Sequence, residues 1–233
     1  MRTAFGLLLI LVFSATHVRG QIRAQKNMPN YNNKPYHFGF YLGINYTDFQ
    51  IRHEPNLNDV ENYVSGVTQT TPGYHVGIIS ELKLSRYFAL RLNPTFSTTV
   101  RRVTFDVYSR TFNRRDYIIR DVESSFIELP LELKLKSKRV DNYQMYLLAG
   151  LRYNIDLASN ENVFDPELLK ITINDFSYEF GVGLDLFFEY FKMSPQIKGF
   201  FGFADIMVRD DGVYPAGVNK LLTRGMLFCI TFE

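Results

Sequence analysis

The chain has few cysteines, no long apolar run after its N-terminus and almost no net charge. It has one cysteine, Cys229, and therefore no internal disulfide. Beyond its first 20 residues it has no apolar run near the roughly 18 residues that indicate a transmembrane helix. Lysine and arginine outnumber aspartate and glutamate by only 26 to 24, so the composition gives no sign of binding to nucleic acid.

Apolar and aromatic residues are abundant instead. Apolar residues make up 46% of the chain and include 21 Phe and 15 Tyr, with no Trp. This content is too high for a disordered chain. The length of 233 residues is enough for one large domain or two small ones.

Residues 1–20 have the pattern of a secretory signal peptide. Arg2 gives a short basic start, residues 4–13 are apolar but too few to span a bilayer, and Gly20 precedes the expected cleavage before Gln21. An uncleaved N-terminal anchor helix is the alternative. Cleavage would remove two arginines and no acid, which leaves 24 basic and 24 acidic residues in an exported chain without disulfides.

The mature chain divides into a polar start and a long segment with a period of two. Residues 21–35 are polar and rich in turn formers, so we expect a flexible N-terminal segment. From residue 36 to residue 233 apolar and polar residues alternate, which predicts β-strands. The eight predicted strands cover about 36–47, 73–84, 87–101, 121–139, 143–157, 171–187, 191–204 and 221–232.

The connections between these strands alternate in length. Those after the first, third, fifth and seventh strands are long, at about 52–72, 102–120, 158–170 and 205–220. Those after the second, fourth and sixth strands are short, at about 85–86, 137–142 and 188–190. This alternation is typical of bacterial outer-membrane barrels. We therefore predict an all-β fold, an eight-stranded antiparallel transmembrane β-barrel.

A soluble eight-stranded barrel with an apolar interior, such as a lipocalin, is the alternative fold. It is disfavoured because the apolar faces of the strands are nearly unbroken and rich in Phe, Leu and Tyr. The opposite faces mix glycine with charged residues, which suits a crowded interior. The apolar faces are therefore predicted to contact lipid and the charged faces to line the lumen.

Charges inside so narrow a barrel need partners, because an unpaired buried charge is costly. The short turns give a rough register in which inward acids meet inward bases. The predicted lumen network consists of Glu81, Arg91, Glu128, Glu132, Lys134, Arg152, Glu179, Asp185, Lys192 and Lys198. Its predicted pairs, within a slippage of one or two residues, are Glu81–Arg91, Glu128–Arg152, Glu179–Lys198 and Asp185–Lys192. A charged permeation path is the alternative role.

Three prolines lie within the predicted strands of this barrel. They are Pro94, Pro130 and Pro195. A closed barrel has no free edge strand to accept a residue without an N–H, so we expect bulges at these positions.

The sequence shows no motif of a common enzyme class. It has no HExxH, no phosphate-binding loop and no GxSxG, and the GVG at 181–183 lies inside a predicted strand. His37 and His75 fall far apart in the rough register, which disfavours a metal site. No cofactor is expected. An outer-membrane enzyme with its site at the loop rim is the least favoured class.

One predicted loop is strongly basic. Between residues 101 and 120 it carries Arg101, Arg102, Arg110, Arg114, Arg115 and Arg120. Guanidinium groups bind phosphate well, so lipopolysaccharide is the favoured partner of this loop. A protein partner is the alternative.

Several stretches resemble the PorT family of outer-membrane barrels in the type IX secretion system of Bacteroidetes. They are SSFIELPLELKLKSKR at 124–139, DFSYEFGVGLDLFFEYFKMSPQIK at 175–198 and PYHFGF at 35–40. The PLELK-type strand followed by LLAGLRY at 147–153 resembles the broader superfamily of these barrels. The terminal FCITFE also resembles the aromatic assembly signal of outer-membrane barrels, although Glu233 follows the last Phe.

This resemblance covers most of residues 35–233 and implies a non-enzymatic role in exporting or maturing secreted proteins. It implies protein partners in the secretion machinery and a location in the outer membrane. It assigns no functional residue. A general small barrel with a structural or adhesive role is the alternative function.

Overall fold

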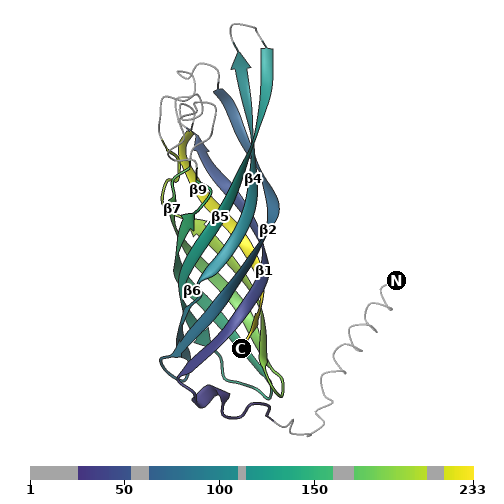
Figure 1. Cartoon of the computed structure of the whole chain (residues 1–233), viewed down its shortest axis with the longest axis vertical. Helices are drawn as coiled ribbons and strands as arrows, with labels where there is room; N and C mark the ends of the chain where they lie inside the picture. Colours follow the sequence, from purple (N-terminus) through teal and green to yellow (C-terminus); the bar gives the residue numbers. More distant parts are fainter. Residues whose placement is uncertain (1–25, 54–62, 110–113, 160–170, 209–217) are drawn as a thin grey trace, which may run out of the picture.

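The computed structural model describes residues 26–53, 63–109, 114–159, 171–208 and 218–233. They form one antiparallel sheet that closes into a barrel, because β1 pairs with both β2 and β9 (Figure 1). The strands are β1 (Tyr36–His53), β2 (Tyr63–Lys83), β3 (Phe88–Leu92), β4 (Thr95–Ser109), β5 (Arg114–Lys136), β6 (Tyr143–Asp156), β7 (Asn174–Phe187), β8 (Lys192–Gly202) and β9 (Val218–Phe232).

The barrel wall is eight strands wide, because β3 and β4 are two parts of one strand. Leu92 pairs with Ser80 of β2 and Thr95 pairs with Gly77, so the pairing continues in the same register across the break. The predicted all-β antiparallel barrel is therefore confirmed. Among the described residues, no helix is long and apolar enough to cross a membrane.

The prolines interrupt hydrogen bonds without shifting the register, so the predicted bulges at Pro94, Pro130 and Pro195 are wrong. Pro94 occupies the break between β3 and β4, where its missing N–H costs no ladder bond, and its carbonyl accepts from Ile78 at 3.0 Å. The neighbouring Asn93 N–H donates to the Pro130 carbonyl at 3.2 Å.

Pro195 on β8 likewise leaves the register of its neighbours unchanged. Pro195 pairs with Ile230 of β9, and on its other side the β7–β8 ladder skips from Gly183 to Leu186 with no change of register. The β2–β4 ladder shifts register at two other places, between Tyr63 and Ser65 and between Thr70 and Tyr74, and the second stretch contains Pro72.

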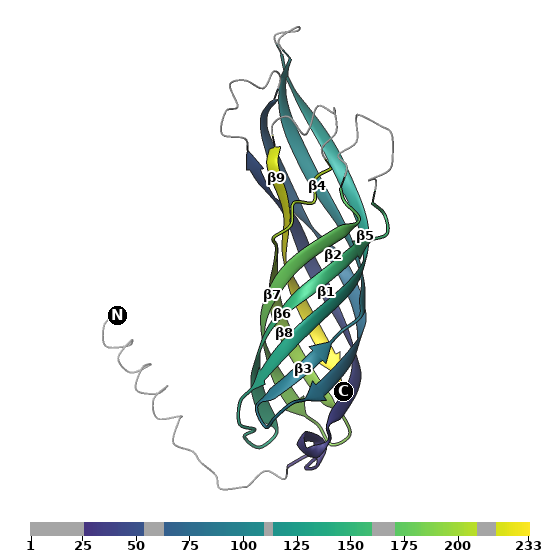
Figure 2. The ribbon, with the colours of Figure 1, turned by 90° about the vertical axis from the view of Figure 1, so that its left-hand side faces the viewer.

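The strands extend further than the sequence pattern predicts at one end of the barrel. The predicted loops 52–72 and 102–120 are largely strand, because β2 begins at Tyr63, β4 continues to Ser109 and β5 begins at Arg114. The β4–β5 hairpin projects beyond the rest of the wall (Figures 1 and 2). Beyond the lipid a strand needs no apolar outer face, so the pattern that located the strands fades while the pairing continues.

The two ends of the barrel differ in their connections. One, the turn end, has the short connections at 84–87, 137–142 and 188–191; the other, the loop end, has the connections at 54–62, 110–113, 157–173 and 203–217. In outer-membrane barrels the short turns face the periplasm.

The outer face of the wall is an apolar band. Aliphatic side chains such as Leu42, Ile78 and Leu147 are at least half exposed there. Aromatic side chains flank them toward both ends of the barrel. At the turn end these are Tyr36, Phe38, Tyr87, Tyr143 and Tyr190, and toward the loop end they are Tyr46, Tyr74, Phe176 and Phe203. This is the arrangement of a wall that crosses a bilayer.

The N-terminal segment crosses the mouth of the barrel at the turn end. Its one helical turn, η2 (Tyr31–Asn33), buries Tyr31, whose hydroxyl donates to Glu233 at 2.6 Å. Burial raises the pKa of the Tyr31 phenol, so it stays protonated and able to donate. Residues 26–35 of the predicted flexible segment 21–35 therefore contact the end of the barrel, and the flexibility of the segment stays a prediction. Residues 21–25 and the predicted signal peptide at 1–20 lie outside the described residues.

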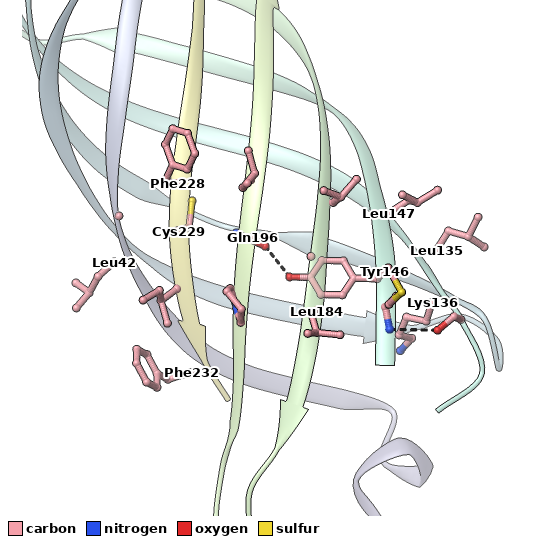
Figure 3. A pocket seen from close by; sticks show the side chains of 18 of the residues that line it. Leu42, Leu135, Lys136, Tyr146, Leu147, Leu184, Gln196, Phe228, Cys229 and Phe232 are labelled. Carbon is pink, nitrogen blue, oxygen red and sulfur yellow. Dashed lines mark hydrogen bonds between the residues drawn. The ribbon is translucent and has the colours of Figure 1, made fainter. Parts of the chain in front are cut away.

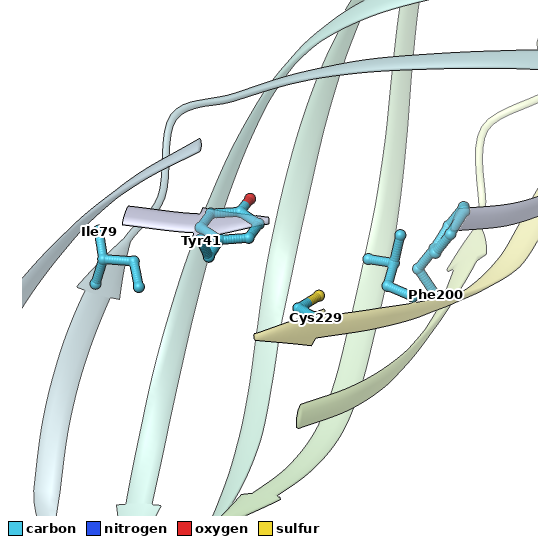
Figure 4. Packing of buried hydrophobic residues seen from close by; sticks show 5 residues of the cluster. Tyr41, Ile79, Phe200 and Cys229 are labelled. Atoms are coloured by element: carbon cyan, nitrogen blue, oxygen red, sulfur yellow. The ribbon is translucent and has the colours of Figure 1, made fainter. Parts of the chain in front are cut away.

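The lumen also contains a small apolar cluster. It is formed by Tyr41, Ile79, Phe200, Leu227 and Cys229 (Figure 4). These side chains come from β1, β2, β8 and β9, and none is more than 3% exposed. The interior is therefore filled partly by apolar side chains and partly by charged ones.

Candidate functional site: the charged lumen

The strand β5 shows how the sequence directs charge into the lumen. Glu132 and Lys134 are 0% exposed, whereas the neighbouring Leu131 and Leu133 are 48% and 43% exposed. Successive side chains of a strand point to opposite faces, so the charged half of this strand faces inward and the leucine half faces outward.

Glu81 of β2 is the centre of one group of charges near the turn end. Its carboxylate lies 2.7 Å from Arg91 Nη2, 3.1 Å from Lys136 Nζ and 3.6 Å from Lys134 Nζ. Arg91 lies directly opposite Glu81 on β3, whereas the two lysines belong to β5. One carboxylate thus joins β2, β3 and β5.

Two further carboxylates complete this group. Asp185 lies 3.0 Å from Lys134 Nζ and 3.9 Å from Lys192 Nζ. Glu233 lies 2.8 Å from Lys192 and 3.0 Å from Arg91. The whole group is named the turn-end cluster and consists of Glu81, Arg91, Lys134, Lys136, Asp185, Lys192 and Glu233.

A second group, the central cluster, lies further along the same strands. Its members are Glu128, Glu132, Arg152, Glu179 and Lys198. Lys198 Nζ lies 2.5 Å from Glu132 and 3.7 Å from Glu179, and Arg152 bridges Glu179 to Glu128, the latter at 3.3 Å. All five side chains are at most 7% exposed.

The two clusters balance each other's charge. The turn-end cluster has four bases and three acids, and the central cluster has two bases and three acids, which gives six of each together. Their long side chains meet across the barrel interior and pack between aromatic rings, as where Lys134 Nζ lies 3.9 Å from the centre of the Tyr146 ring. The clusters therefore place equal numbers of acidic and basic side chains in one buried network inside the barrel.

Comparison with known proteins identifies the family. The model of the outer membrane protein beta-barrel domain family matches residues 23–208. The chain belongs to this family. No curated protein matches the chain closely enough to count as a relative.

Solved structures resemble the barrel only distantly. Neisserial surface protein A is 6% identical with a TM-score of 0.46, and covers 85% of this chain and 98% of its own. The outer membrane protein OprG from Pseudomonas aeruginosa is 14% identical with a TM-score of 0.46, and covers 91% of this chain and 98% of its own.

Family membership agrees with the apolar outer band and the charged interior. The protein is an outer-membrane β-barrel of a bacterial cell. Its apolar wall contacts lipid, and the general orientation of such barrels places short turns on the periplasmic side.

In this outer-membrane barrel the structure brings together the four predicted pairs. The shortest N–O distances are 2.7 Å for Glu81–Arg91, 3.3 Å for Glu128–Arg152, 3.7 Å for Glu179–Lys198 and 3.9 Å for Asp185–Lys192. Only Glu81 and Arg91 are direct cross-strand partners. The other three pairs are diagonal, offset by two residues, because residues such as Pro130 and Gly181 occupy the opposite positions.

Sequence reasoning missed several members of the lumen. Lys136 and Glu233 fall at positions that alternate with the outward-facing residues of β5 and β9. This alternation was the signal that they belong to the lumen network. Tyr31 carried no such signal, because it lies in a single helical turn outside any repeating pattern.

The predicted basic loop is not a loop, and the structure separates its arginines. Arg101 points into the lumen, is 1% exposed and stacks on Phe49 with its guanidinium carbon 4.1 Å from the ring centre. Arg102 points outward on β4 and pairs with Asp121 at 2.6 Å. The same alternation of a strand therefore sends neighbouring arginines to opposite faces.

For the other arginines of residues 101–120 the structure describes at most the strand to which they belong. Arg114, Arg115 and Arg120 belong to β5, and Arg110 lies outside the described residues.

The two lumen histidines are far apart, as the rough register predicts. His37 lies opposite Glu81 and His75 lies opposite Gly43, six residues further along β1. His37 Nε2 lies 2.9 Å from the Tyr31 carbonyl, and His75 Nε2 lies 3.0 Å from Cys229 Sγ. Each histidine therefore has a structural contact of its own.

Proposed function

We propose that the protein is a non-enzymatic accessory component of type IX protein secretion, needed to export or mature cargo proteins but not itself their conduit. Two observations support the proposal: the resemblance of residues 124–139 and 175–198 to the PorT family, and membership in the outer-membrane barrel family.

The filled lumen carries the second half of this proposal. Arg91, Lys134, Lys192 and Lys198 are among the largest fully buried side chains, and each reaches a carboxylate. Lys134 and Lys198 reach carboxylates on strands that are not their neighbours in the wall. A barrel of eight strands encloses only enough space for its own side chains, whereas aqueous channels occur in barrels of about 16 strands. A cargo protein has no passage here.

The surfaces left for function are therefore on the outside. The aromatic-rich wall is suited to pack against a larger translocon within the membrane, and the β4–β5 hairpin projects beyond the rest of the wall at the loop end (Figure 2). The exposed Arg102 is suited to contact lipopolysaccharide phosphates there.

A clean gene deletion tests the export role. We expect unprocessed cargo to accumulate in the periplasm while the permeability of the outer membrane to small solutes stays unchanged. Normal cargo secretion in the deletion strain would refute the export role, and a loss of surface adhesion in that strain would support the adhesive alternative.

Reconstitution of the purified protein in planar bilayers tests the closed lumen separately. We expect no conductance steps. Stable conductance steps would show an open channel through the barrel. They would contradict the closed lumen but would leave the export role untested.

A further inference from the structure

A basic pocket lies at the turn end, where the N-terminal segment passes over the β2–β3 and β5–β6 turns. It encloses about 530 Å³. Six of its lining side chains are basic and none is acidic. The basic ones are Lys26, Lys83, Arg86, Lys136, Lys138 and Arg139.

Most of this positive charge has no carboxylate partner. Lys136 pairs with Glu81 inside the barrel. Lys83 donates to the Asn32 carbonyl at 2.5 Å, and Arg139 donates to backbone carbonyls of the N-terminal segment; neither contact cancels the charge.

The other three basic side chains have no carboxylate partner among the described residues. They are Lys26, Arg86 and Lys138. Arg86 and Lys138 are exposed. The pocket therefore presents a concave positive surface to the periplasmic side.

An apolar groove on the lipid-facing wall adjoins this pocket, because three residues line both (Figure 3 shows the groove). The groove encloses about 1430 Å³ and shares Tyr87, Lys136 and Ser137 with the pocket. Next to these shared residues the groove is lined by Leu135 and Met145. A cationic recess and a hydrocarbon surface thus meet at the level of the turn-end aromatic residues, where lipid headgroups lie.

We propose that the basic pocket binds the phosphate of an anionic phospholipid from the periplasmic leaflet, with an acyl chain of that lipid in the groove. Charge complementarity selects the headgroup, because juxtamembrane lysine and arginine attract anionic lipids. The adjoining groove favours a lipid over an acidic peptide, which would leave the groove unfilled. The inference does not depend on the export role.

Native mass spectrometry of the full mature protein in detergent tests the proposal. The probes are dioleoyl phosphatidylglycerol, the neutral-headgroup dioleoyl phosphatidylethanolamine, and glycerophosphoglycerol, which has the anionic headgroup without chains. We expect one phosphatidylglycerol to bind in preference to phosphatidylethanolamine. The chainless headgroup should compete poorly, because it cannot use the groove.

The test variant is Arg86→Gln with Lys138→Gln, and the matched control is Lys34→Gln with Lys220→Gln. All four side chains are exposed, and neither control residue lines the pocket. The test variant should bind phosphatidylglycerol about 30-fold more weakly, since each basic side chain near an anionic surface contributes about fivefold. The control should bind like the unaltered protein.

Three outcomes would overturn the proposal. Equal binding by the test variant and its control would show that the pocket does not hold the headgroup. Equal competition by glycerophosphoglycerol would show a site for soluble phosphate rather than lipid. Binding of a poly-glutamate peptide that phosphatidylglycerol does not displace would show a peptide site.

Discussion

The central cluster makes a sharp prediction about Arg152. Its guanidinium forms ion pairs with both Glu128 and Glu179, and its side chain is 2% exposed. Replacing Arg152 by Met leaves two buried carboxylates with less compensation. Because Lys198 still lies 3.7 Å from Glu179 and Ser97 still donates to Glu128 at 2.6 Å, the loss stays within the usual range for a broken buried pair. That range is about 3–5 kcal/mol in the free energy of unfolding.

The companion substitution separates this pair from its surroundings. Glu128→Gln alone leaves Arg152 with Glu179 and should cost about 1–3 kcal/mol, the usual loss for one disrupted charged hydrogen bond. With both substitutions, one of the two carboxylates that Arg152→Met leaves without its guanidinium partner is already gone. The double variant should therefore be more stable than the sum of the single losses predicts, by about 1–3 kcal/mol.

Urea unfolding in lipid vesicles, followed by the change in gel mobility on heating, measures these free energies. The exposed pair Arg102–Asp121 provides the control, since 47% and 41% of its side-chain surfaces are accessible. The same pair of changes there, Arg102→Met and Asp121→Asn, should leave the unfolding midpoint unchanged. Strictly additive losses at Glu128 and Arg152 would refute the coupling.

Two further predictions concern close packing and the N-terminal segment. Gly183→Ala should destabilise the barrel by about 1–3 kcal/mol in the same assay, because a Cβ at Gly183 would overlap the ring of Tyr146. Tyr31→Phe removes the hydrogen bond to Glu233 and should speed amide hydrogen exchange in residues 26–35 while the strands exchange as before.

Each of these predictions has a matched control on the same chain. Gly199→Ala adds the same methyl group where the nearest atom is 3.9 Å away, and it should be neutral. Tyr36→Phe removes a hydroxyl from a side chain that is 60% exposed, and exchange should not change. Equal effects in variant and control would contradict the packing role of Gly183 or the anchoring role of Tyr31.

The sequence predicted the parts of this barrel that repeat with a period of two. Alternation alone placed Glu132 and Lys134 inside and the leucines outside, because side chains of a strand can take only two directions. Short turns fixed the register closely enough to match acids with bases within two residues.

The same rule failed where its physical cause disappears. Beyond the bilayer the outer face of a strand meets water and needs no apolar side chains. The pattern of residues 63–72 and 102–109 therefore predicts loop, although these residues pair as parts of β2 and β4. The docking of Tyr31 depends on one contact between segments far apart in the chain. Such a contact leaves no periodic trace in the sequence.

Many lumen ion pairs join strands that are not neighbours in the wall, and this constrains how the barrel assembles. Lys198 of β8 reaches Glu132 of β5 across β6 and β7, and Lys134 of β5 reaches Asp185 of β7 across β6. These contacts form only when the sheet has curled. An open sheet that entered hydrocarbon would carry these charges uncompensated, at a cost of several kcal/mol each. We therefore expect the closure of the barrel to be coupled to its insertion into the membrane, because the ion pairs between distant strands compensate these charges only in the closed barrel.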